Sequence, residues 1–291
     1  MYSGEVTVKK YTAKIRRIIH KILLFLMPDC RYKQEWLTYY RFRSSFEDAG
    51  YAVAVKRDIV RISGNGIVIT GNSGNTILTA HGILCGHEYD FFSPFDCIVV
   101  DIGLNIGIAS VFFAQKNNVK KVYAYEPFLP TLKQALENLS NNPFCEGKVE
   151  TFPFGLGNAE KELTIHYNAD QPGSMSTVRD VYPDSPVSEK VVIKSAASEL
   201  SSVFTRHPDF KKVFKIDCEG SEVEILQDLQ SGGLLQQIDL ILLEWHWGCA
   251  ETLIQELIKN GFALTCRHDI PNKQGVIIAF RNSSDFNGQI A

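Results

Sequence analysis

The sequence lacks three features, and each absence removes a class of function. Its 7 cysteines include no C-x-x-C pair, so a cysteine zinc site of the usual spacing is not expected. Lys and Arg number 30 against 33 Asp and Glu, a net charge of −3, so no nucleic-acid partner is expected. No apolar run approaches the roughly 20 residues that a membrane-spanning helix needs. An odd number of cysteines without paired spacing favours free thiols in a reducing cytoplasm.

The most apolar stretch before residue 50 is Ile22–Met27, which follows the basic segment Ile15–Lys21. The run is too short for a membrane span, and Met-Pro-Asp-Cys, starting at Met27, is not a small-residue signal cleavage site. Two interpretations stay open. The preferred one is an amphipathic helix packed on the rest of the protein or on a partner subunit. In the other, residues 11–27 form an interfacial helix that keeps the protein peripheral to a membrane.

The pattern of apolar residues changes near residue 94, and we predict a division into residues 1–94 and 95–291. Residues 1–46 have a helical pattern. Three short stretches of period two follow, separated by turns rich in Gly, Asn and Ser, and they predict a small antiparallel β appendage. These stretches are Tyr51–Val55, Ile59–Ile62 and Ile67–Thr70.

From residue 95 onward, buried strands alternate with helices. This alternation predicts an α/β fold with a doubly wound, mostly parallel sheet and helices on both of its faces. Ala263–Arg267 and Val276–Phe280 form a closing pair of strands. A long loop is predicted at 168–190, where Pro, Ser, Asp and Gly are frequent.

The centre of this pattern is Ile98-Val-Val-Asp-Ile-Gly-Leu-Asn-Ile-Gly107, followed by Val122-Tyr-Ala-Tyr-Glu-Pro127. A buried strand ends in an acid, a loop with two glycines and a helix follow, and a second strand ends in Glu126. Such a unit binds a nucleoside, because the backbone approaches the ligand at the glycines and the second acid takes the ribose diol.

The glycine spacing is not the G-x-G-x-x-G that cradles a pyrophosphate. An acid at the end of the strand would repel a pyrophosphate but suits an ammonium or a hydroxyl group, so S-adenosylmethionine is the predicted ligand. The predicted donor-binding residues are Asp101, Gly103, Asn105, Gly107, Glu126, Pro127, Phe128 and Asp217.

Further acids follow later strands, and in a parallel sheet these strand ends share one edge with the nucleoside site. They are Asp217, Glu219 and Glu244, with His246 just beyond. We predict that Asp217, Glu219 and His246 are catalytic. Asp217 would bind the amino group of the donor or accept a proton, whereas Glu219 and His246 are the better general bases. A neutral imidazole suits that role near pH 7.

Binding of a divalent metal is an alternative role for the same edge of the sheet, but it is not favoured. Asp217, Glu219, Glu244 and His246 offer carboxylate oxygens and an imidazole, which suit Mg²⁺ or Mn²⁺. Such an ion could lower the pKa of an acceptor hydroxyl.

The chain resembles the FkbM family of S-adenosylmethionine-dependent methyltransferases from about Phe95 to Trp247. The segments that carry the resemblance are Val100–Gly107, Val122–Pro127, Leu136–Asn138, Gly173–Ser176, Lys215–Glu222 and Leu243–His246. The resemblance implies a seven-stranded Rossmann-like sheet with an antiparallel last strand. It also implies O-methylation, typically of a sugar or polyketide hydroxyl.

The predicted function is therefore methyl transfer from S-adenosylmethionine to a hydroxyl of a sugar, a glycan or a related small molecule. Two alternatives belong to other classes: a non-catalytic nucleoside-binding module and a nucleotide-dependent oxidoreductase. The missing third glycine disfavours the oxidoreductase. The sequence specifies neither the acceptor nor the oligomeric state.

Overall fold

The computed structural model describes residues 31–56, 59–71, 74–167, 175–179, 181–269 and 272–281, together with residues 15, 18, 19, 21, 22, 25 and 26. Most of the predicted amphipathic segment 11–27 lies outside the described residues, as do residues 168–174 and 180 of the predicted loop. Within the described part of the chain, no helix is both long enough and apolar enough to cross a bilayer.

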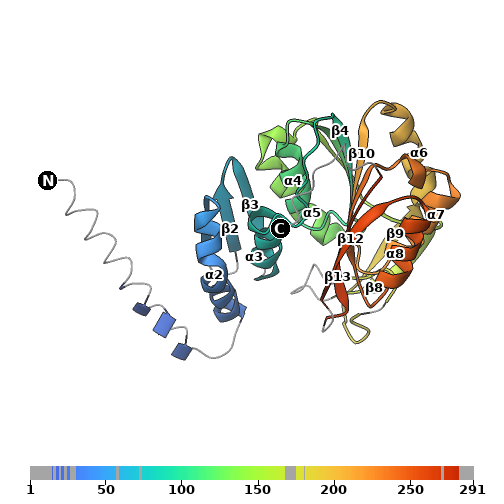
Figure 1. Cartoon of the computed structure of the whole chain (residues 1–291). Helices are drawn as coiled ribbons and strands as arrows, with labels where there is room; N and C mark the ends of the chain where they lie inside the picture. Colours follow the sequence, from blue (N-terminus) through green and yellow to red (C-terminus); the bar gives the residue numbers. More distant parts are fainter. Residues whose placement is uncertain are drawn as a thin grey trace.

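A twisted seven-stranded sheet forms the centre of the molecule, in the order β12-β13-β11-β10-β4-β5-β6 (Figure 1). The last strand in the chain, β13, runs antiparallel to both of its neighbours, β11 and β12. The pairs that join β11, β10, β4, β5 and β6 are all parallel. The predicted fold class and its antiparallel last strand are confirmed. The strands are β4 (Cys97–Ile102), β5 (Val119–Tyr125), β6 (Val149–Phe152), β10 (Lys211–Ile216), β11 (Leu240–Trp245), β12 (Ala263–Asp269) and β13 (Gln274–Phe280).

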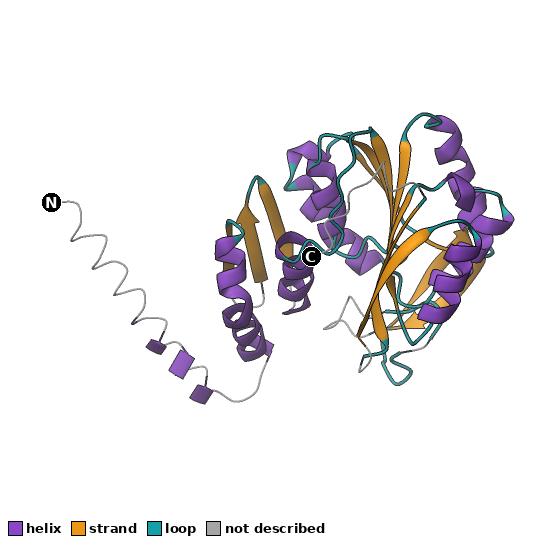
Figure 2. Ribbon diagram, in the orientation of Figure 1, coloured by secondary structure: helices purple, strands orange, loops and turns teal. Residues whose placement is uncertain are grey.

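Helices cover both faces of this sheet (Figure 2). Successive residues of a strand point to opposite faces, and β4 shows the result. Val99 packs into the hydrophobic cluster that contains residues of α4 and α5. Ile98 and Val100 pack into the cluster formed with α6, α7 and α8. The helices are α4 (Ile108–Gln115), α5 (Leu129–Ser140), α6 (Ala196–Arg206), α7 (Glu222–Ser231) and α8 (Ala250–Lys259).

The described part of residues 1–94 contains the three predicted antiparallel strands between two helical segments. Its elements are α2 (Arg31–Asp48), β1 (Tyr51–Lys56), β2 (Ile59–Gly64), β3 (Ile67–Gly71), α3 (Gly74–Ala80) and the π-helical turn η1 (His81–Cys85). Ile62, Ile69 and Ile77 belong to the same hydrophobic cluster as Val99 and Phe113 of the main sheet and α4. The appendage therefore shares a core with the main sheet, and the division at residue 94 stays a prediction.

Two asparagines of α5 and its following turn hold the appendage against the main domain. The Asn138 side chain accepts from the Thr70 backbone N–H at 2.8 Å and donates to the Thr70 carbonyl at 2.9 Å. Asn142 makes the same pair of bonds with Val68, at 2.9 and 2.7 Å. Both side chains are fully buried, so these four bonds satisfy the free edge of β3 without a further strand.

A second, smaller sheet has the order β7-β9-β8. It consists of β7 (Gly155–Gly157), β8 (Lys161–His166) and β9 (Ser188–Ser195). Strand β9 and the helix α6 that follows it were not predicted from the sequence. Ser195 begins that helix, and its hydroxyl accepts from the Ser198 backbone N–H at 3.1 Å.

Candidate active site

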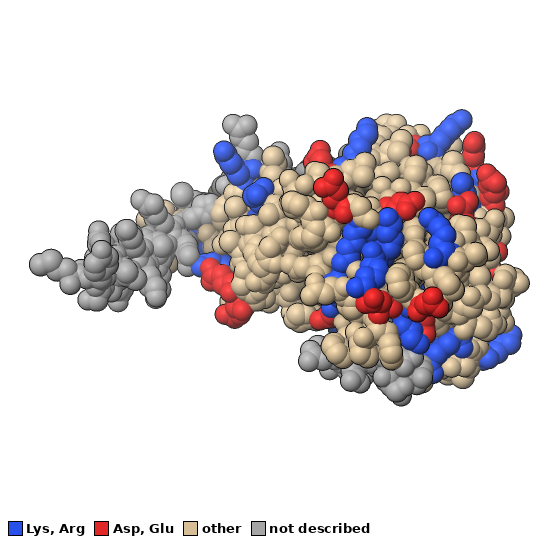
Figure 3. Space-filling view, turned by 90° about the horizontal axis from the view of Figure 1, so that it is seen from above, with Lys and Arg blue, Asp and Glu red and all other residues tan. Residues whose placement is uncertain are grey.

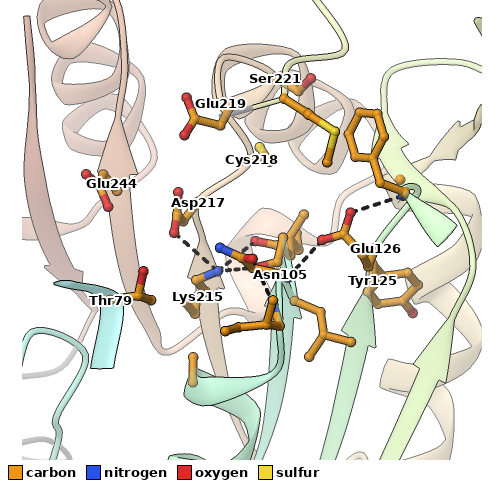
Figure 4. Close-up of a pocket in the computed structure, with 18 of the residues that line it drawn as sticks. Thr79, Asn105, Tyr125, Glu126, Lys215, Asp217, Cys218, Glu219, Ser221 and Glu244 are labelled. Carbon is orange, nitrogen blue, oxygen red and sulfur yellow. Dashed lines mark hydrogen bonds and ion pairs between the residues drawn. The ribbon is translucent and has the colours of Figure 1, made fainter. Parts of the chain in front are cut away.

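A cavity of about 310 Å³ lies at the carboxyl ends of β4, β5, β10 and β11. This volume is at the lower end of the range of roughly 300–1,000 Å³ that is typical of small-molecule sites. Figure 4 shows strand-end residues from these strands converging on it. One wall comes from the N-terminal part of the chain, through Asn75, Leu78, Thr79, Ile83, Glu88 and Tyr89. The appendage therefore helps to form the cavity.

Asp101, at the end of β4, lies behind the cavity wall rather than in it. Its side chain is fully buried. One carboxylate oxygen accepts from the Ser110 hydroxyl at 2.6 Å, and the other lies 3.2 Å from the Lys215 ammonium. Burial raises the pKa of Asp101, while the Lys215 charge opposes that rise. Asp101 is not among the residues that line the cavity, and its contact with the donor stays a prediction.

The loop after β4 brings backbone groups to the cavity, and its glycines are required by close packing. A Cβ on Gly103 would lie 1.8 Å from the Asp217 carbonyl oxygen, so only glycine lets the ends of β4 and β10 meet. Gly103 and Asn105 line the cavity. Gly107 precedes α4 with a φ of 86°, a backbone conformation that favours glycine, and its contact with the donor stays a prediction.

Among the predicted donor-binding residues, Glu126 at the end of β5 has the carboxylate that backbone groups hold most firmly. The carboxylate is 5% exposed and accepts the Asn105 N–H at 2.8 Å and the Phe128 N–H at 3.1 Å. Burial raises the pKa of Glu126 to about 7, and these two backbone bonds oppose the rise. A carboxylate has about four acceptor positions, so two remain for a ligand diol.

Apolar side chains line the cavity beyond Glu126. Phe128 is buried in a small cluster with Ile165, Met175 and Val191. Pro127, Phe128, Leu156, Met175 and Ile193 all line the cavity. This end of the cavity therefore suits the flat, apolar faces of a base.

Lys215 lies between the two ends of the cavity, and no role was predicted for it from the sequence. Its ammonium group donates to the Gly103 carbonyl and forms ion pairs with Asp101 at 3.2 Å and Asp217 at 3.5 Å. The residue is 2% exposed. Burial lowers the pKa of Lys215, but the two carboxylates outweigh that effect and raise it overall. The lysine is therefore charged and neutralises the acids that surround it.

Tyr89 places its hydroxyl between two of the predicted acids. The oxygen lies 3.2 Å from Asp217 Oδ2 and 3.2 Å from Glu244 Oε2. One hydroxyl proton cannot serve both acceptors. Burial, followed by the Asp217 charge, raises the pKa of Glu244 to about 8. A protonated Glu244 can donate to Tyr89 while Tyr89 donates to Asp217, and this arrangement satisfies all three groups.

His246 is held by a buried carboxylate and faces two of the predicted catalytic acids. Its Nδ1 lies 2.9 Å from Glu222 Oε1, and Glu222 is fully buried at the start of α7. On the other side of the ring, Nε2 lies 3.7 Å from Glu219 and 3.9 Å from Asp217. Glu219 itself has a φ of 54°, a conformation that costs energy in a non-glycine residue.

The charges at this end differ from the expectation of a neutral imidazole. Burial lowers the pKa of His246, but the Glu222 hydrogen bond and the nearby carboxylates outweigh it and raise the pKa to about 9. Burial raises the pKa of Glu219 to about 7, although the His246 charge opposes that rise. His246 is therefore protonated near pH 7, and the expectation that it is neutral is wrong. Glu219 is the carboxylate poised to exchange a proton at that pH.

The four residues predicted as alternative metal ligands are only partly grouped. Among the described residues, Asp217, Glu219 and His246 each offer a ligand atom, and these atoms lie within 4.8 Å of one another. Glu244 is outside this group, and it contacts Tyr89 instead.

The structure thus brings Asp217, Glu219, Glu244 and His246 to one end of the cavity and Glu126 to the other. Three partners were missed: Lys215, Tyr89 and Glu222. A lysine inside the apolar strand Val213–Ile216 was a usable signal, since buried lysines are nearly always paired. No local pattern in the sequence indicates the contacts that Tyr89 makes, because its partners lie 128 and 155 residues away.

Comparison with known proteins places the chain among methyltransferases. A model of the methyltransferase FkbM domain matches residues 101–263. The chain is 24% identical over 209 residues to the methyltransferase sdnD of Sordaria araneosa, covering 63% of this chain and 80% of that protein. It is 25% identical over 214 residues to the AMB antimetabolite synthetase AmbE of Pseudomonas aeruginosa, covering 60% of this chain and 10% of AmbE.

A solved structure of an FkbM methyltransferase from Methylobacillus flagellatus KT is also similar, with a TM-score of 0.42 and 13% identity. The alignment covers 86% of this chain and 62% of that chain. The present chain thus spans a tenth of AmbE and less than two thirds of the Methylobacillus protein. The family match at 101–263 includes every strand-end residue from Asp101 to His246.

Proposed function

The chain belongs to the FkbM methyltransferase family, and on that premise we propose that it methylates a hydroxyl oxygen of a neutral sugar, glycan or related small molecule, with S-adenosylmethionine as the donor. Family membership selects a methyltransferase over the oxidoreductase and over the non-catalytic nucleoside-binding module. The observation that carries the finer proposal is the pair formed by Glu219 and His246. A carboxylate with a pKa of about 7 lies 3.7 Å from a protonated imidazole, at the end of the cavity away from Glu126.

The donor fits the end of the cavity that holds Glu126. The two unused acceptor positions of Glu126 would take the ribose diol, and the apolar lining around Phe128 and Met175 would cover the adenine. Asp217 would accept from the ammonium of the methionine tail, next to the loop that contains Gly103. This placement directs the sulfonium methyl toward Glu219 and His246.

Glu219 would act as the general base. The acceptor hydroxyl gives its proton to the Glu219 carboxylate as the oxygen attacks the methyl carbon. The carbon–sulfur bond breaks, and its electron pair neutralises the sulfonium. His246, protonated and held by Glu222, would stabilise the negative charge that develops on the oxygen, because a fixed cation there requires no reorganisation.

The end of the cavity that holds Glu219, Glu244 and His246 is called the acceptor end. Its charge favours a neutral acceptor. Asp217, Glu219 and Glu244 surround it. Burial is the main cause of the raised pKa values of the two glutamates, and the Asp217 charge adds to both rises. Arg267 is already paired with Glu88 at 3.1 Å. A phosphorylated or carboxylated acceptor would meet repulsion, whereas hydroxyl groups can donate to these carboxylates.

Calorimetry tests the donor assignment. Wild-type protein should bind S-adenosylmethionine and not NAD. Glu126→Gln should weaken donor binding about 10- to 100-fold, because hydrogen bonds to a charged group contribute about 1.5–3 kcal/mol. Glu137→Gln, at a site on α5 that does not line the cavity, is the matched control and should bind like the wild type. Binding of NAD alone would overturn the donor assignment.

A radiolabelled methyl donor tests the acceptor class. Neutral glycosides should be methylated, and the matching sugar phosphates should not. If amines are methylated while neutral glycosides are not, the O-methylation proposal is wrong even though the family assignment stands.

A divalent ion at Asp217, Glu219 and His246 is the competing arrangement. Glu222 holds Nδ1 of His246 as carboxylates hold metal-binding histidines, which leaves Nε2 directed toward the two acids. Activity that survives thorough chelation would eliminate it. Activity that is lost on chelation and restored by Mn²⁺ would replace the general-base mechanism with a metal-assisted one.

A further inference from the structure

The segment 175–179 packs against the turn that carries Glu219, and it has no role in the mechanism above. Its Ser176 is 1% exposed. The Ser176 hydroxyl donates to the Glu219 carbonyl at 2.7 Å and accepts from the backbone N–H groups of Val178 and Arg179, each at 3.2 Å. One buried hydroxyl therefore joins this segment to the turn.

The two kinds of bond differ in what they can do. The bonds to the N–H groups of Val178 and Arg179 are local, so they shape the segment itself. The bond to Glu219 crosses 43 residues of sequence, so it fixes one segment relative to another. A turn cap alone would require only the local bonds.

The turn that Ser176 contacts has an unusual backbone. Glu219 has a φ of 54°, a conformation that persists in a non-glycine residue only where its surroundings fix it. The next residue, Gly220, has a φ of 115°, and a Cβ there would lie 2.1 Å from the Trp247 ring and 2.6 Å from the Val178 side chain. Packing on this turn is therefore tight, and contacts from outside the turn hold its shape.

The peptide unit between Glu219 and Gly220 is held at both ends. Ser176 donates to its carbonyl, and its N–H donates to Glu222 Oε1 at 3.0 Å. The same Glu222 oxygen lies 2.9 Å from His246 Nδ1. The orientation of this peptide sets the ψ angle of Glu219, so the two bonds hold the residue whose carboxylate lies 3.7 Å from His246 Nε2.

We propose that Ser176 is a positioning residue for methyl transfer, because its hydroxyl holds the Glu219 turn and thereby keeps the Glu219 carboxylate beside His246. This inference rests on the proposed function, in which Glu219 is the general base. Reacting groups must lie about 3–3.5 Å apart, and a shift of about 1 Å is enough to slow a reaction strongly. A fixed turn is therefore a requirement of the chemistry as well as of the fold.

Steady-state kinetics test the proposal with saturating S-adenosylmethionine and the neutral glycoside acceptor of the radiolabel assay. Ser176→Ala should lower kcat about tenfold, which corresponds to the loss of one hydrogen bond. The acceptor KM should stay within about twofold of wild type, because the base moves while the acceptor contacts remain. Ser176→Thr keeps the hydroxyl and should keep most of the wild-type kcat. Equal losses of kcat in the two variants would overturn the inference.

A double-mutant cycle with Glu219→Gln shows whether Ser176 acts through the base. In the Glu219→Gln background, Ser176→Ala should change kcat by less than about twofold, because the group that it positions no longer takes a proton. A tenfold loss in that background would overturn the positioning role and leave Glu219 as the base. Wild-type kcat in Glu219→Gln alone would instead remove the general base, and the inference would fail together with the proposed mechanism.

The matched control is Ser93→Ala. Ser93 is also buried, and its hydroxyl donates to the Phe95 carbonyl at 3.4 Å and accepts the Phe95 N–H at 3.2 Å. It precedes β4, at the amino end of the parallel strands, and does not line the cavity. Figure 3 looks onto this end of the molecule, where Lys and Arg side chains gather. Ser93→Ala should keep the wild-type kcat.

Crystal structures of the two alanine variants test the geometry without an acceptor. In Ser176→Ala the Glu219 carboxylate should lie about 1 Å or more farther from His246 Nε2 than in the wild type, a shift large enough to account for the slower reaction. In Ser93→Ala this distance should be unchanged. A Glu219 turn that keeps its wild-type position in Ser176→Ala would overturn the inference.

Discussion

The two ends of the cavity are built in different ways. At the donor end, backbone N–H groups of Asn105 and Phe128 hold the single carboxylate of Glu126. At the acceptor end, side chains hold one another, with His246 fixed by Glu222 and Tyr89 placed between two acids. The position of Glu126 therefore depends on the path of the backbone loop, whereas the side chains at the acceptor end are held by their charges.

This difference fits the two proposed tasks, which are donor binding and proton transfer. A donor that is the same in every turnover can be bound by a fixed loop, and backbone groups keep their positions through side-chain changes. In the proposed mechanism the acceptor end moves a proton, and three groups there have pKa values of about 7, 8 and 9, for Glu219, Glu244 and His246. Groups that titrate in this range suit general acid–base chemistry near pH 7.

Lys215 lies between the two ends of the cavity, so its substitution should have the largest effect on stability and on binding. Lys215→Met leaves the fully buried Asp101 without its cation, and breaking a buried pair from one side costs about 3–5 kcal/mol. We expect a free energy of unfolding lowered by that amount in urea denaturation, with loss of both donor and acceptor binding.

The matched control for this variant is Lys161→Met. Lys161 pairs with Glu224 at 3.3 Å, but its side chain is 33% exposed, against 3% for Lys215. An exposed pair contributes about 0–1 kcal/mol, so this variant should stay close to the wild type. Similar losses for the two variants would show that Lys215 does not join the two ends.

Glu219→Gln should distinguish the contributions of the two ends, because it should slow the methyl-transfer step without weakening donor binding. Loss of a general base lowers kcat by about 10²- to 10⁴-fold. The donor dissociation constant should stay within about twofold of wild type, since a change of under 0.5 kcal/mol corresponds to that factor. Glu251→Gln, in the exposed first turn of α8, controls for loss of a carboxylate. A large loss of donor binding in Glu219→Gln would place Glu219 in the donor site.

With the donor saturating, the pH dependence of kcat/KM for the acceptor should report the acceptor end, because Glu126, whose pKa is also raised to about 7, is then occupied by the donor. kcat/KM should rise through pH 7 as Glu219, with a raised pKa of about 7, loses its proton and becomes a base. It should fall above pH 9 as His246, with a raised pKa of about 9, loses the charge that faces the reacting oxygen. In Glu219→Gln the rise near pH 7 should disappear from the residual activity. A rise that persists in that variant would assign the base to another group.

The sequence predicted the main sheet and the position of Gly103, Asn105 and Glu126 at the cavity, because both depend on local patterns. A buried strand, a glycine loop and a strand-end acid are close together in the chain, and Asp101 to Glu126 spans a single strand–helix–strand unit. The antiparallel last strand followed from the family resemblance and is confirmed. Asp101 was identified as a site residue, but its burial behind the wall depends on Lys215, which a strand pattern does not place.

The acceptor end could be located from sequence, but its charges could not be assigned. Strand order places Asp217, Glu219 and His246 at one edge, as predicted. The protonation of His246 depends on Glu222, which looks in sequence like an ordinary acid in the first turn of a helix. Strand β9 was missed because it follows a polar loop and belongs to the second sheet rather than the main one.

Tyr89→Phe gives the smallest expected effect, and it tests whether residues before 95 take part in the site. Removal of the hydroxyl leaves Asp217 and Glu244 without their shared partner, and a bond of this kind contributes about 0.5–1.5 kcal/mol. The acceptor KM should rise about three- to tenfold on that basis. Tyr123→Phe is the matched control, because Tyr123 is equally buried but bonds His207 at 2.7 Å, outside the cavity. If the two variants change the acceptor KM equally, Tyr89 is a packing residue and the acceptor end is built by the main sheet alone.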